Sequence, residues 1–154
     1  MRNRALGYLA RREYAVAELH RKLLPYAESV AELESLISDL KSEDYLSDLR
    51  FAQQFTEIRG RRFGVRRIGY ELKQRGVSDE IIETLLVQMK REEFNGIKNV
   101  WLKKFGHLAE DYPGRMKQQR FLQQRGFSTE AIQRLFSALG DKDGLNFASM
   151  DEIG

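Results

Sequence analysis

Apolar residues recur along this chain at intervals of three and four positions, which is the spacing of one buried face on an α-helix. Serine residues precede three of these faces, as helix-capping residues do. The faces are Leu33, Leu36, Ile37 and Leu40 after Ser29, where Glu32 completes a capping box; Ile81, Ile82, Leu85, Leu86 and Met89 after Ser78; and Ile132, Leu135, Phe136 and Leu139 after Ser128.

The remaining apolar residues predict further helices in the same way. Only two prolines interrupt the chain, and strand-like alternation of apolar and polar residues is missing. The pattern therefore predicts an all-α fold. The additional helix faces are Leu6 and Leu9; Val16, Leu19 and Leu23; Phe51, Phe55 and Ile58; Val65, Ile68 and Leu72; and Ile97, Val100 and Trp101.

One phrase occurs twice. ELKQRGVSDEIIETLL, residues 71–86, returns as FLQQRGFSTEAIQRLF, residues 121–136. In each copy a glycine, Gly76 or Gly126, can end a helix in the left-handed conformation at low cost. The next apolar residue packs the turn and a serine begins the following helix. The repeat therefore predicts the same helix-turn-helix corner at two places.

A fainter copy precedes both. In LKSEDYLSD, Tyr45 and Ser47 stand roughly where Val77 and Ser78 stand in the clear copy, with one extra residue. The helices upstream also match, because REYAVAELHRKL aligns with RRFGVRRIGYEL. A repeat period close to 50 residues indicates stacked supersecondary units.

The repeat predicts a domain organisation of tandem three-helix units. We expect them to stack into an elongated, curved solenoid, with a flexible acidic tail after the last unit. The expected segments are a leading helix at 1–11, units at about 12–62, 63–112 and 113–139, and the tail at 140–154.

Composition narrows the class of protein. Of 154 residues, 32% are charged and 42% hydrophobic, which is too apolar for a disordered chain and too charged for a membrane-spanning one. The N-terminus has arginines where a signal peptide needs an apolar stretch. We therefore expect a cytoplasmic protein that does not insert in a membrane, and the lack of cysteine agrees with this expectation.

The net charge of +3 conceals a strong segregation of charge along the chain. Residues 59–76 hold seven basic residues against one acid, and residues 98–125 hold seven against two. Residues 28–48 reverse the balance, with seven acids against one lysine. Basic stretches of this kind are typical of proteins that meet nucleic acid or an acidic protein surface.

The helix after Gly64 shows how the basic residues are arranged. Arg66, Tyr70 and Lys73 form one row, while Val65 and its apolar partners point elsewhere. A basic row with an aromatic residue suits phosphate or an acidic groove. The candidate partner-binding or DNA-binding residues are Arg59, Arg61, Arg62, Arg66, Arg67, Tyr70, Lys73, Arg75, Lys103, Lys104, Arg115, Lys117, Arg120 and Arg125.

The sequence offers little for catalysis. His20 and His107 lie in no metal-spaced cluster, and GVRRIG lacks the lysine and hydroxyl of a phosphate-binding loop. The paired acids are interpreted as solvated or helix-start charges. We therefore expect no enzyme activity and no cofactor or metal. The paired acids are Asp79 with Glu80, and Glu92 with Glu93.

Taken together, the motifs resemble those of the RecX family of bacterial recombination regulators. The resemblance extends from about Arg4 to Leu139. It rests on an Asp-x-Arg-Phe-Ala stretch, a basic helix start with glycine, and the two glycine corners. The residues that carry it are Asp48, Arg50, Phe51 and Ala52; Arg62 and Gly64; Leu72 and Gly76; and Arg125, Gly126, Phe127 and Ser128.

The resemblance implies an all-helical regulator that binds the RecA recombinase filament on single-stranded DNA. It also implies inhibition of the filament's ATPase, strand-exchange and coprotease activities. We expect a monomer that binds bare single-stranded DNA only weakly. The alternative is a sequence-tolerant DNA-binding protein that acts through its basic helix faces. The third repeat differs from the others, because Arg115 and Gln118 stand where Val65 and Ile68 predict core.

Overall fold

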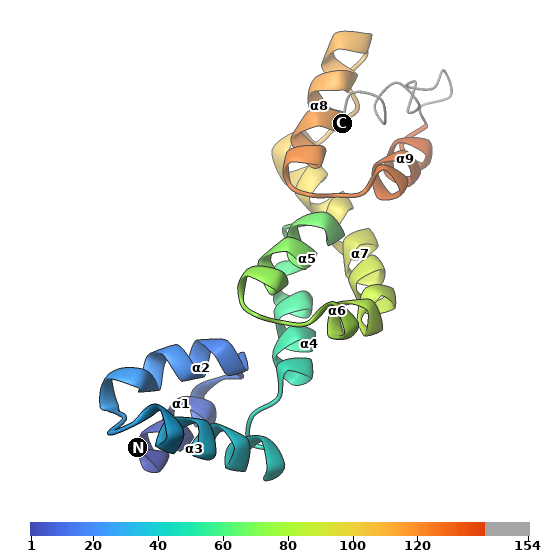
Figure 1. The fold of residues 1–154 in the computed structure, drawn as a ribbon. Coiled ribbons are helices and arrows are strands. Elements are labelled where there is room, and N and C mark those ends of the chain that lie inside the picture. The colour runs from blue at the N-terminus through green and yellow to red at the C-terminus, as the bar shows by residue number, and fades with distance from the viewer. Residues whose placement is uncertain (141–154) are drawn as a thin grey trace. The chain divides into compact units, whose positions relative to one another are not determined.

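The computed structural model describes residues 1–140, and these residues are helical without any strand (Figure 1). The expected all-α fold is therefore confirmed for this part of the chain. The acidic tail expected at 140–154 lies outside the described residues from 141 onward. The helices are α1 (Arg2–Arg11), α2 (Val16–Leu23), the 3-10 helix η1 (Leu24–Tyr26), α3 (Val30–Ser42), α4 (Asp48–Arg59), α5 (Val65–Gln74), α6 (Asp79–Thr84), α7 (Leu86–Lys104), α8 (Tyr112–Gln124) and α9 (Thr129–Ala138).

The chain divides into two compact units. Among the described residues, unit 1 consists of residues 1–55 and 71–85, and unit 2 consists of residues 56–70 and 86–140. Two of the three boundaries between the units fall inside helices, α4 and α5, and the third lies between α6 and α7. The three repeat segments and the elongated shape expected from the sequence stay predictions.

Unit 1 is built around the apolar faces of its first three helices. Leu19, Leu33 and Leu40 are fully buried, and partly buried residues of α1 pack against them. The face predicted for α3 is confirmed, because all four of its apolar residues lie in this core. The core residues are Ala5, Tyr14, Leu19, Leu23, Leu33, Leu36, Ile37, Leu40 and Leu46.

Unit 2 has a second core, formed by α7, α8 and α9. It includes one polar pair, in which Trp101 Nε1 donates to Gln118 Oε1 at 3.2 Å. Gln118 Nε2 in turn donates to the backbone oxygen of His107 at 2.9 Å. Gln118 is buried as its repeat position predicts, and its amide is satisfied. The apolar core residues are Ile97, Trp101, Leu122, Phe127, Ala131, Ile132, Leu135 and Phe136.

The two predicted glycine corners are confirmed. Gly76 and Gly126 both have φ of +85°, in the left-handed region that glycine adopts without strain. The residue after each glycine donates its backbone N–H to the fifth residue before it, as in a Schellman motif. Val77 and Phe127 are buried at these turns, and Ser78 and Ser128 cap the helices that follow.

The fainter corner is also present, with a different residue at its turn. Asp44 takes the left-handed position, with φ of 66°, and the backbone N–H of Tyr45 donates to Leu40 O at 2.9 Å. Tyr45 is 50% exposed, and the extra residue Leu46 is buried in its place. Ser47 then caps α4 by accepting from Arg50 N at 3.2 Å.

Two apolar faces differ from the prediction. Ile58 is 56% exposed because the buried face of α4 passes through Ala52 and Thr56. The helix expected to run through Ser78–Met89 is interrupted at Leu85, where α6 ends before α7 begins. This interruption turns Leu86 outward, so that it is 38% exposed, whereas Leu85 remains buried.

Candidate functional site

The candidate site in unit 2 depends on a backbone contact between two turns. The turn between α4 and α5 lies against the corner between α8 and α9. The backbone N–H of Gly64 donates to Arg125 O at 3.0 Å, and that of Arg66 donates to Gly126 O at 3.1 Å. These bonds fix the arginine-rich turn relative to the end of α8.

Glu93 holds the same two turns together from inside. Its Oε2 accepts from the backbone N–H groups of Val65 at 2.9 Å and Ser128 at 3.0 Å, and its Oε1 accepts from Ser128 Oγ at 2.6 Å. The carboxylate thus satisfies the N-terminal ends of α5 and α9, where negative charge is favourable. Glu93 is 3% exposed, so its interpretation as a solvated charge was wrong.

Unit 1 contains an equivalent bond at an equivalent position. Asp48 Oδ1 accepts from the backbone N–H of Val16 at 2.7 Å, as Glu93 does from Val65. Val16 and Val65 are the residues that the repeat aligns with each other. A carboxylate that caps the first residue of an earlier helix is therefore part of the repeated structure. Asp48 provides this carboxylate in unit 1, and Glu93 provides it in unit 2.

Arg50 and Phe51, the other residues of the Asp-x-Arg-Phe-Ala stretch, are also structural. Arg50 donates to Glu13 Oε1 at 3.1 Å, Asp44 Oδ1 at 2.9 Å and Asp44 O at 2.7 Å. Phe51 is 5% exposed and its ring lies 5.6 Å from that of Phe55. These contacts hold the left-handed turn at Asp44 in place.

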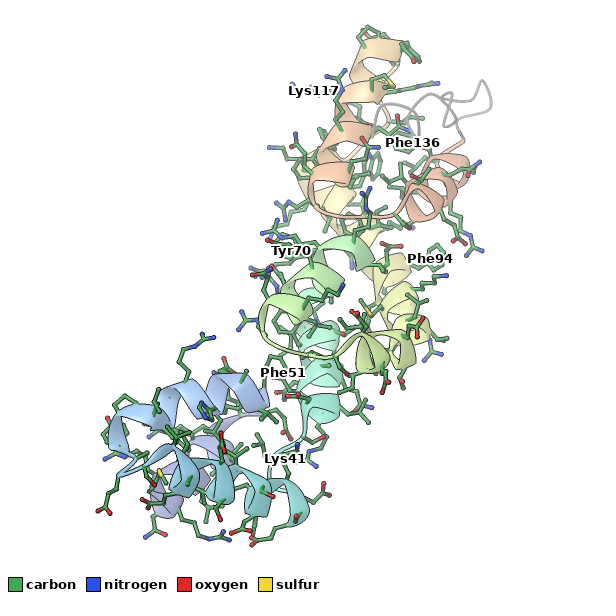
Figure 2. All side chains as sticks on the ribbon, in the orientation of Figure 1. Lys41, Phe51, Tyr70, Phe94, Lys117 and Phe136 are labelled. Carbon is green, nitrogen blue, oxygen red and sulfur yellow. The ribbon has the colours of Figure 1, made fainter. Side chains whose placement is uncertain are left out.

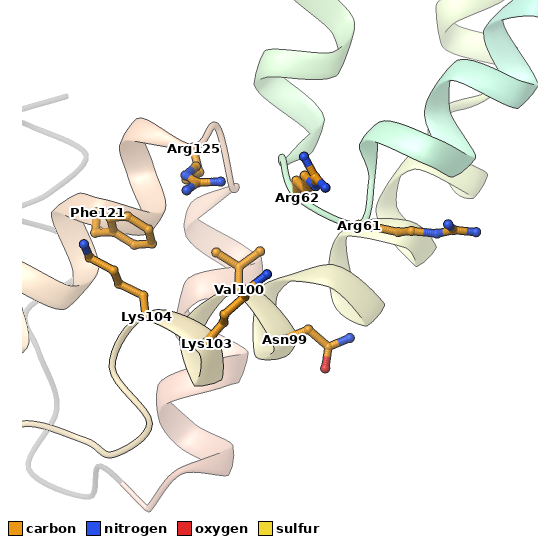
Figure 3. Close-up of a pocket in the computed structure, with 8 residues that line it drawn as sticks. All are labelled: Arg61, Arg62, Asn99, Val100, Lys103, Lys104, Phe121 and Arg125. Carbon is orange, nitrogen blue, oxygen red and sulfur yellow. The ribbon is translucent and has the colours of Figure 1, made fainter.

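A second close approach brings the arginine-rich turn against α7. Gly96 has no side chain, and a Cβ there would collide with the backbone oxygen of Gly60. Glycine at position 96 therefore lets the end of α4 rest directly on α7. Arg61 and Arg62 follow immediately and lie beside the C-terminal half of α7 (Figure 3).

The result is a groove of about 560 Å³, called the basic groove below (Figure 3). The turn after α4 contributes Arg61 and Arg62, α7 contributes two lysines, and Arg125 stands at the end of α8. None of the lining side chains is acidic. The lining residues are Arg61, Arg62, Asn99, Val100, Lys103, Lys104, Phe121 and Arg125.

Aromatic rings hold several of these cations in position. The Arg125 guanidinium lies 5.4 Å from the centre of the Phe63 ring and 5.1 Å from that of Phe121. Lys104 Nζ lies 5.5 Å from the Phe121 ring. Phe63 also carries Arg59 at 4.1 Å and Arg67 at 4.0 Å. Such cation–π contacts favour positive charge at the groove.

The remaining predicted basic residues lie elsewhere. Lys73 and Arg75 belong to unit 1, where Lys73 pairs with Asp79 at 3.1 Å and Arg75 with Glu18 at 3.6 Å. Arg75 also lies 5.0 Å from the Phe55 ring. Of the predicted row on α5, Lys73 is thus paired with an acid inside unit 1, and Arg75, which follows the end of α5, is paired in the same way.

Some predicted residues of unit 2 are exposed outside the groove lining. Arg66 and Tyr70 project from α5, and Lys117 and Arg120 from α8; Figure 2 labels Tyr70 and Lys117. Arg115 is half-buried, and its Nε donates to Ala109 O at 2.9 Å. Arg115 therefore holds the chain before α8.

The sequence identified the five cations of the groove but missed its other members, Asn99, Val100 and Phe121. Position 121 is equivalent to Glu71 in the repeated phrase, so the repeat gave no reason to select it. Glu93 was also missed, although a usable signal exists. Glu93 lies four residues after Met89 and four before Ile97, on the buried face of α7.

Among residues 1–140, no three histidine, cysteine, aspartate or glutamate side chains gather as metal ligands would. No helix in the same range combines the length and apolar character needed to cross a membrane.

Two family models match this chain. The second three-helix domain of RecX matches residues 47–86, and the third three-helix domain of RecX matches residues 91–136. The chain belongs to the RecX family. The corner at Gly76 falls in the second domain, and the corner at Gly126 in the third, so the family resemblance and the tandem three-helix repeat are both confirmed.

RecX relatives match over most of their length. The regulatory protein RecX of Ralstonia nicotianae is 42% identical over 135 residues, covering 88% of this chain and 85% of that protein. The regulatory protein RecX of Chromobacterium violaceum is 40% identical over 144 residues, covering 93% of each. A regulatory role within the RecX family follows from these matches.

Solved structures agree on the fold. The crystal structure of RecX from Lactobacillus salivarius superposes with a TM-score of 0.75 at 21% identity, covering 90% of this chain and 93% of that one. A second crystal structure, of regulatory protein RecX, gives a TM-score of 0.73 at 19% identity, covering 92% and 71%. At this identity the likeness concerns the fold alone.

Proposed function

We propose that this RecX protein binds the filament of a RecA-type recombinase on single-stranded DNA and inhibits its ATPase, strand-exchange and coprotease activities. The observation that carries the proposal is the close match to proteins called regulatory protein RecX, at 42% identity over most of both chains. The RecX regulator acts in the cytoplasm as a monomer and needs no catalytic residue.

Inhibition by occupancy explains how a helical protein without a catalytic centre regulates an enzyme. A regulator bound along a filament raises the cost of protomer movements that would displace it. Its basic residues favour an acidic filament surface or the phosphate of the bound strand. The cations of the basic groove all belong to unit 2, whereas Lys73 and Arg75 of unit 1 are paired with acids. This separation leaves unit 2 strongly positive, which supports the proposal.

The direct test follows ATP hydrolysis by preformed recombinase filaments while purified RecX protein is added. The proposal expects hydrolysis to fall with a saturable dependence on RecX concentration. Hydrolysis that stays constant at saturating RecX contradicts the proposal. A parallel reaction, in which the protein is added before the recombinase meets DNA, separates a block to filament assembly from inhibition of turnover.

A second function competes with this one. The basic groove favours a sequence-tolerant DNA-binding protein that regulates recombination by covering DNA. In that case added competitor DNA abolishes inhibition in proportion to the affinity for bare strands. If filament contact is responsible, inhibition persists in competitor DNA and requires assembled recombinase.

A further inference from the structure

The repeat places the same contact at two positions of the chain, and the two contacts differ. In unit 2 the start of α5 lies against the corner between α8 and α9, and this contact is called the second joint. In unit 1 the start of α2 lies against the corner between α5 and α6, where a Cβ on Gly76 would lie 2.9 Å from Ala17 Cβ. This contact is called the first joint. The repeat aligns Ala15 with Gly64 and Gly76 with Gly126, so the two joints can be compared residue by residue.

The second joint is fixed by backbone contacts. Two backbone hydrogen bonds of 3.0 and 3.1 Å cross it, and the Glu93 carboxylate accepts hydrogen bonds from both sides. Gly126 is buried at the corner. The close approach requires glycine at position 64, because a Cβ there would collide with the backbone of the corner. Both sides of the second joint are therefore held in one arrangement.

The first joint has fewer contacts. Among residues 1–140, no backbone hydrogen bond crosses it, and Asp48 bonds Val16 on the α2 side without a bond to the corner. Ala15 explains part of this difference, because it carries a methyl group where Gly64 has none. Gly76 is exposed, and a groove of about 540 Å³ remains beside it. The first joint is therefore open to solvent.

An ion pair crosses the first joint. Arg75 Nη1 lies 3.6 Å from Glu18 Oε2, and the two side chains are 45% and 22% exposed. A partly exposed pair of this kind changes an equilibrium by a factor of only about two to five. Ala17 and Gly76 bring little apolar surface to the contact, so burial adds little to the ion pair.

Helices α1–α3 do not need the corner to complete their core. Every residue of that core, from Ala5 to Leu46, precedes α4, and none comes from residues 71–85. Separation of α2 from the corner therefore leaves the apolar core of these helices intact. Local openings of this kind have free energies well below that of global unfolding.

We propose that unit 1 opens at the first joint, with helices α1–α3 moving as one body away from the α5–α6 corner while both parts stay folded. The second joint stays closed under the same conditions. The protein thereby has two arrangements of its first three helices, and the ion pair between Glu18 and Arg75 favours the closed one. The inference concerns unit 1 by itself and does not rest on the proposed function.

Paired spin labels test the proposal, because the chain has no cysteine and labels can be attached at chosen positions. Arg21→Cys with Gln74→Cys spans the first joint. Tyr70→Cys with Gln124→Cys spans the second joint at the positions that the repeat makes equivalent, and all four residues are exposed. Double electron–electron resonance should give one narrow distance distribution at the second joint. At the first joint the distribution should be about twice as wide or show a second, longer distance.

Matched variants test the ion pair. Arg75→Gln removes the pair that crosses the first joint, whereas Lys73→Gln removes a pair with Asp79 that lies within the corner. Arg75→Gln should raise the population of the longer distance about two- to fivefold, and Lys73→Gln should leave it unchanged. KCl at about 1 M should act as Arg75→Gln does, because salt screens a partly exposed pair.

Gly64→Ala tests the reason for the difference between the joints. It should broaden the distribution at the second joint, whereas Gly69→Ala on the same helix should not, because a Cβ at position 69 meets only Met89 Cε at 3.9 Å. Circular dichroism melting verifies that each labelled variant is folded. Should Gly64→Ala not fold, the two label pairs and Arg75→Gln still decide the question.

Three outcomes overturn the inference. Equally narrow distributions at the two joints would show that the first joint stays closed. Equal effects of Arg75→Gln and Lys73→Gln would remove the ion pair from the explanation. A longer distance that appears only together with loss of the helical circular dichroism signal would show that unit 1 unfolds and does not open.

Discussion

The backbone of Gly64 lies directly against that of Phe127. A Cβ at position 64 would collide with the Cα of Phe127 and the carbonyl oxygen of Gly126. The contact joins two turns more than 60 residues apart in the chain, and the arginines of the basic groove come from both turns. The lack of a side chain at position 64 lets the two turns pack closely, and this packing positions the arginines of the basic groove.

Replacing Gly64 should be costly. Gly64→Ala is expected to lower the free energy of unfolding by about 3 kcal/mol, because backbone must shift to admit the methyl group. Gly69→Ala, on the same helix α5, meets nothing nearer than Met89 Cε at 3.9 Å and should be neutral or stabilising. Urea unfolding of both variants measures the difference, and equal midpoints would show that the two turns separate readily.

The corner glycines should differ in cost, although their φ angles agree. Gly126→Ala should destabilise the protein more than Gly76→Ala. A Cβ at position 126 would collide with Arg67, including its backbone, whereas a Cβ at position 76 would lie 2.9 Å from Ala17 Cβ. Gly140 has φ of +88°, and a Cβ at this position would meet no atom within 4 Å. Gly140→Ala therefore reports the conformational cost alone, about 1 kcal/mol. The loss of melting temperature should be largest for Gly126→Ala, smaller for Gly76→Ala and smallest for Gly140→Ala. Any other order refutes the steric explanation.

Removing the Glu93 carboxylate should destabilise unit 2. Glu93→Ala leaves three donors of Val65 and Ser128 without this acceptor, for an expected loss of about 3 kcal/mol. The neighbouring Glu92→Ala keeps the Cβ that lies beside Gly60 and should cost less than about 1 kcal/mol. Urea unfolding tests the pair, and a stable Glu93→Ala variant would mean that water replaces the carboxylate.

Acid should weaken unit 1 through Glu18. Partial burial raises its pKa, but hydrogen bonds from Arg12 at 3.1 Å and the charges of Arg12 and Arg75 outweigh burial, so the pKa lies below its usual range. A lowered folded-state pKa stabilises the fold above the unfolded value of about 4.3 and loses that contribution as pH falls through the folded value. Melting temperature should therefore depend less on pH below about 4 in Glu18→Gln than in the parent.

The exposed part of the α5 row offers a test of the recombinase contact. Arg66→Glu should raise the RecX concentration for half-inhibition of filament ATPase about fivefold, or about 1 kcal/mol, if this side chain faces an acidic filament surface. Arg11→Glu, exposed on α1 in unit 1, is the control for charge. Arg67 should be left intact in this experiment, because it lies against Gly126 and the Phe63 ring. Unchanged inhibition by Arg66→Glu would move the contact away from α5.

Local signals in the sequence were sufficient where structure depends on neighbours in the chain. Gly76 and Gly126 could be predicted because a helix end is set within about six residues. The prediction that Ile58 is buried was wrong, because the elements packed against α4 determine which of its faces is buried. Ala52 and Thr56 lie on that face instead. Spacing alone cannot supply that information.

Long-range polar bonds were the hardest features to predict. Glu93 carries a charge, and composition favours solvent for charged residues unless a partner is known. Its partners, Val65 and Ser128, are 28 and 35 residues away and are bonded partly through backbone N–H groups, which every residue has. The basic groove could not be predicted for the same reason, because its residues come from segments far apart in the chain. The sequence pattern did not distinguish its cations from Lys73 and Arg75.

Trp101 is the only tryptophan of the chain, and it is buried in the core of unit 2 beside Gln118. Its fluorescence therefore reports the unfolding of that unit, while the far-ultraviolet helical signal reports both units. If the two signals change at one urea concentration, the shared helices α4 and α5 make the units unfold cooperatively. If they change separately, one unit can open while the other remains folded, and the protein has two stabilities to describe.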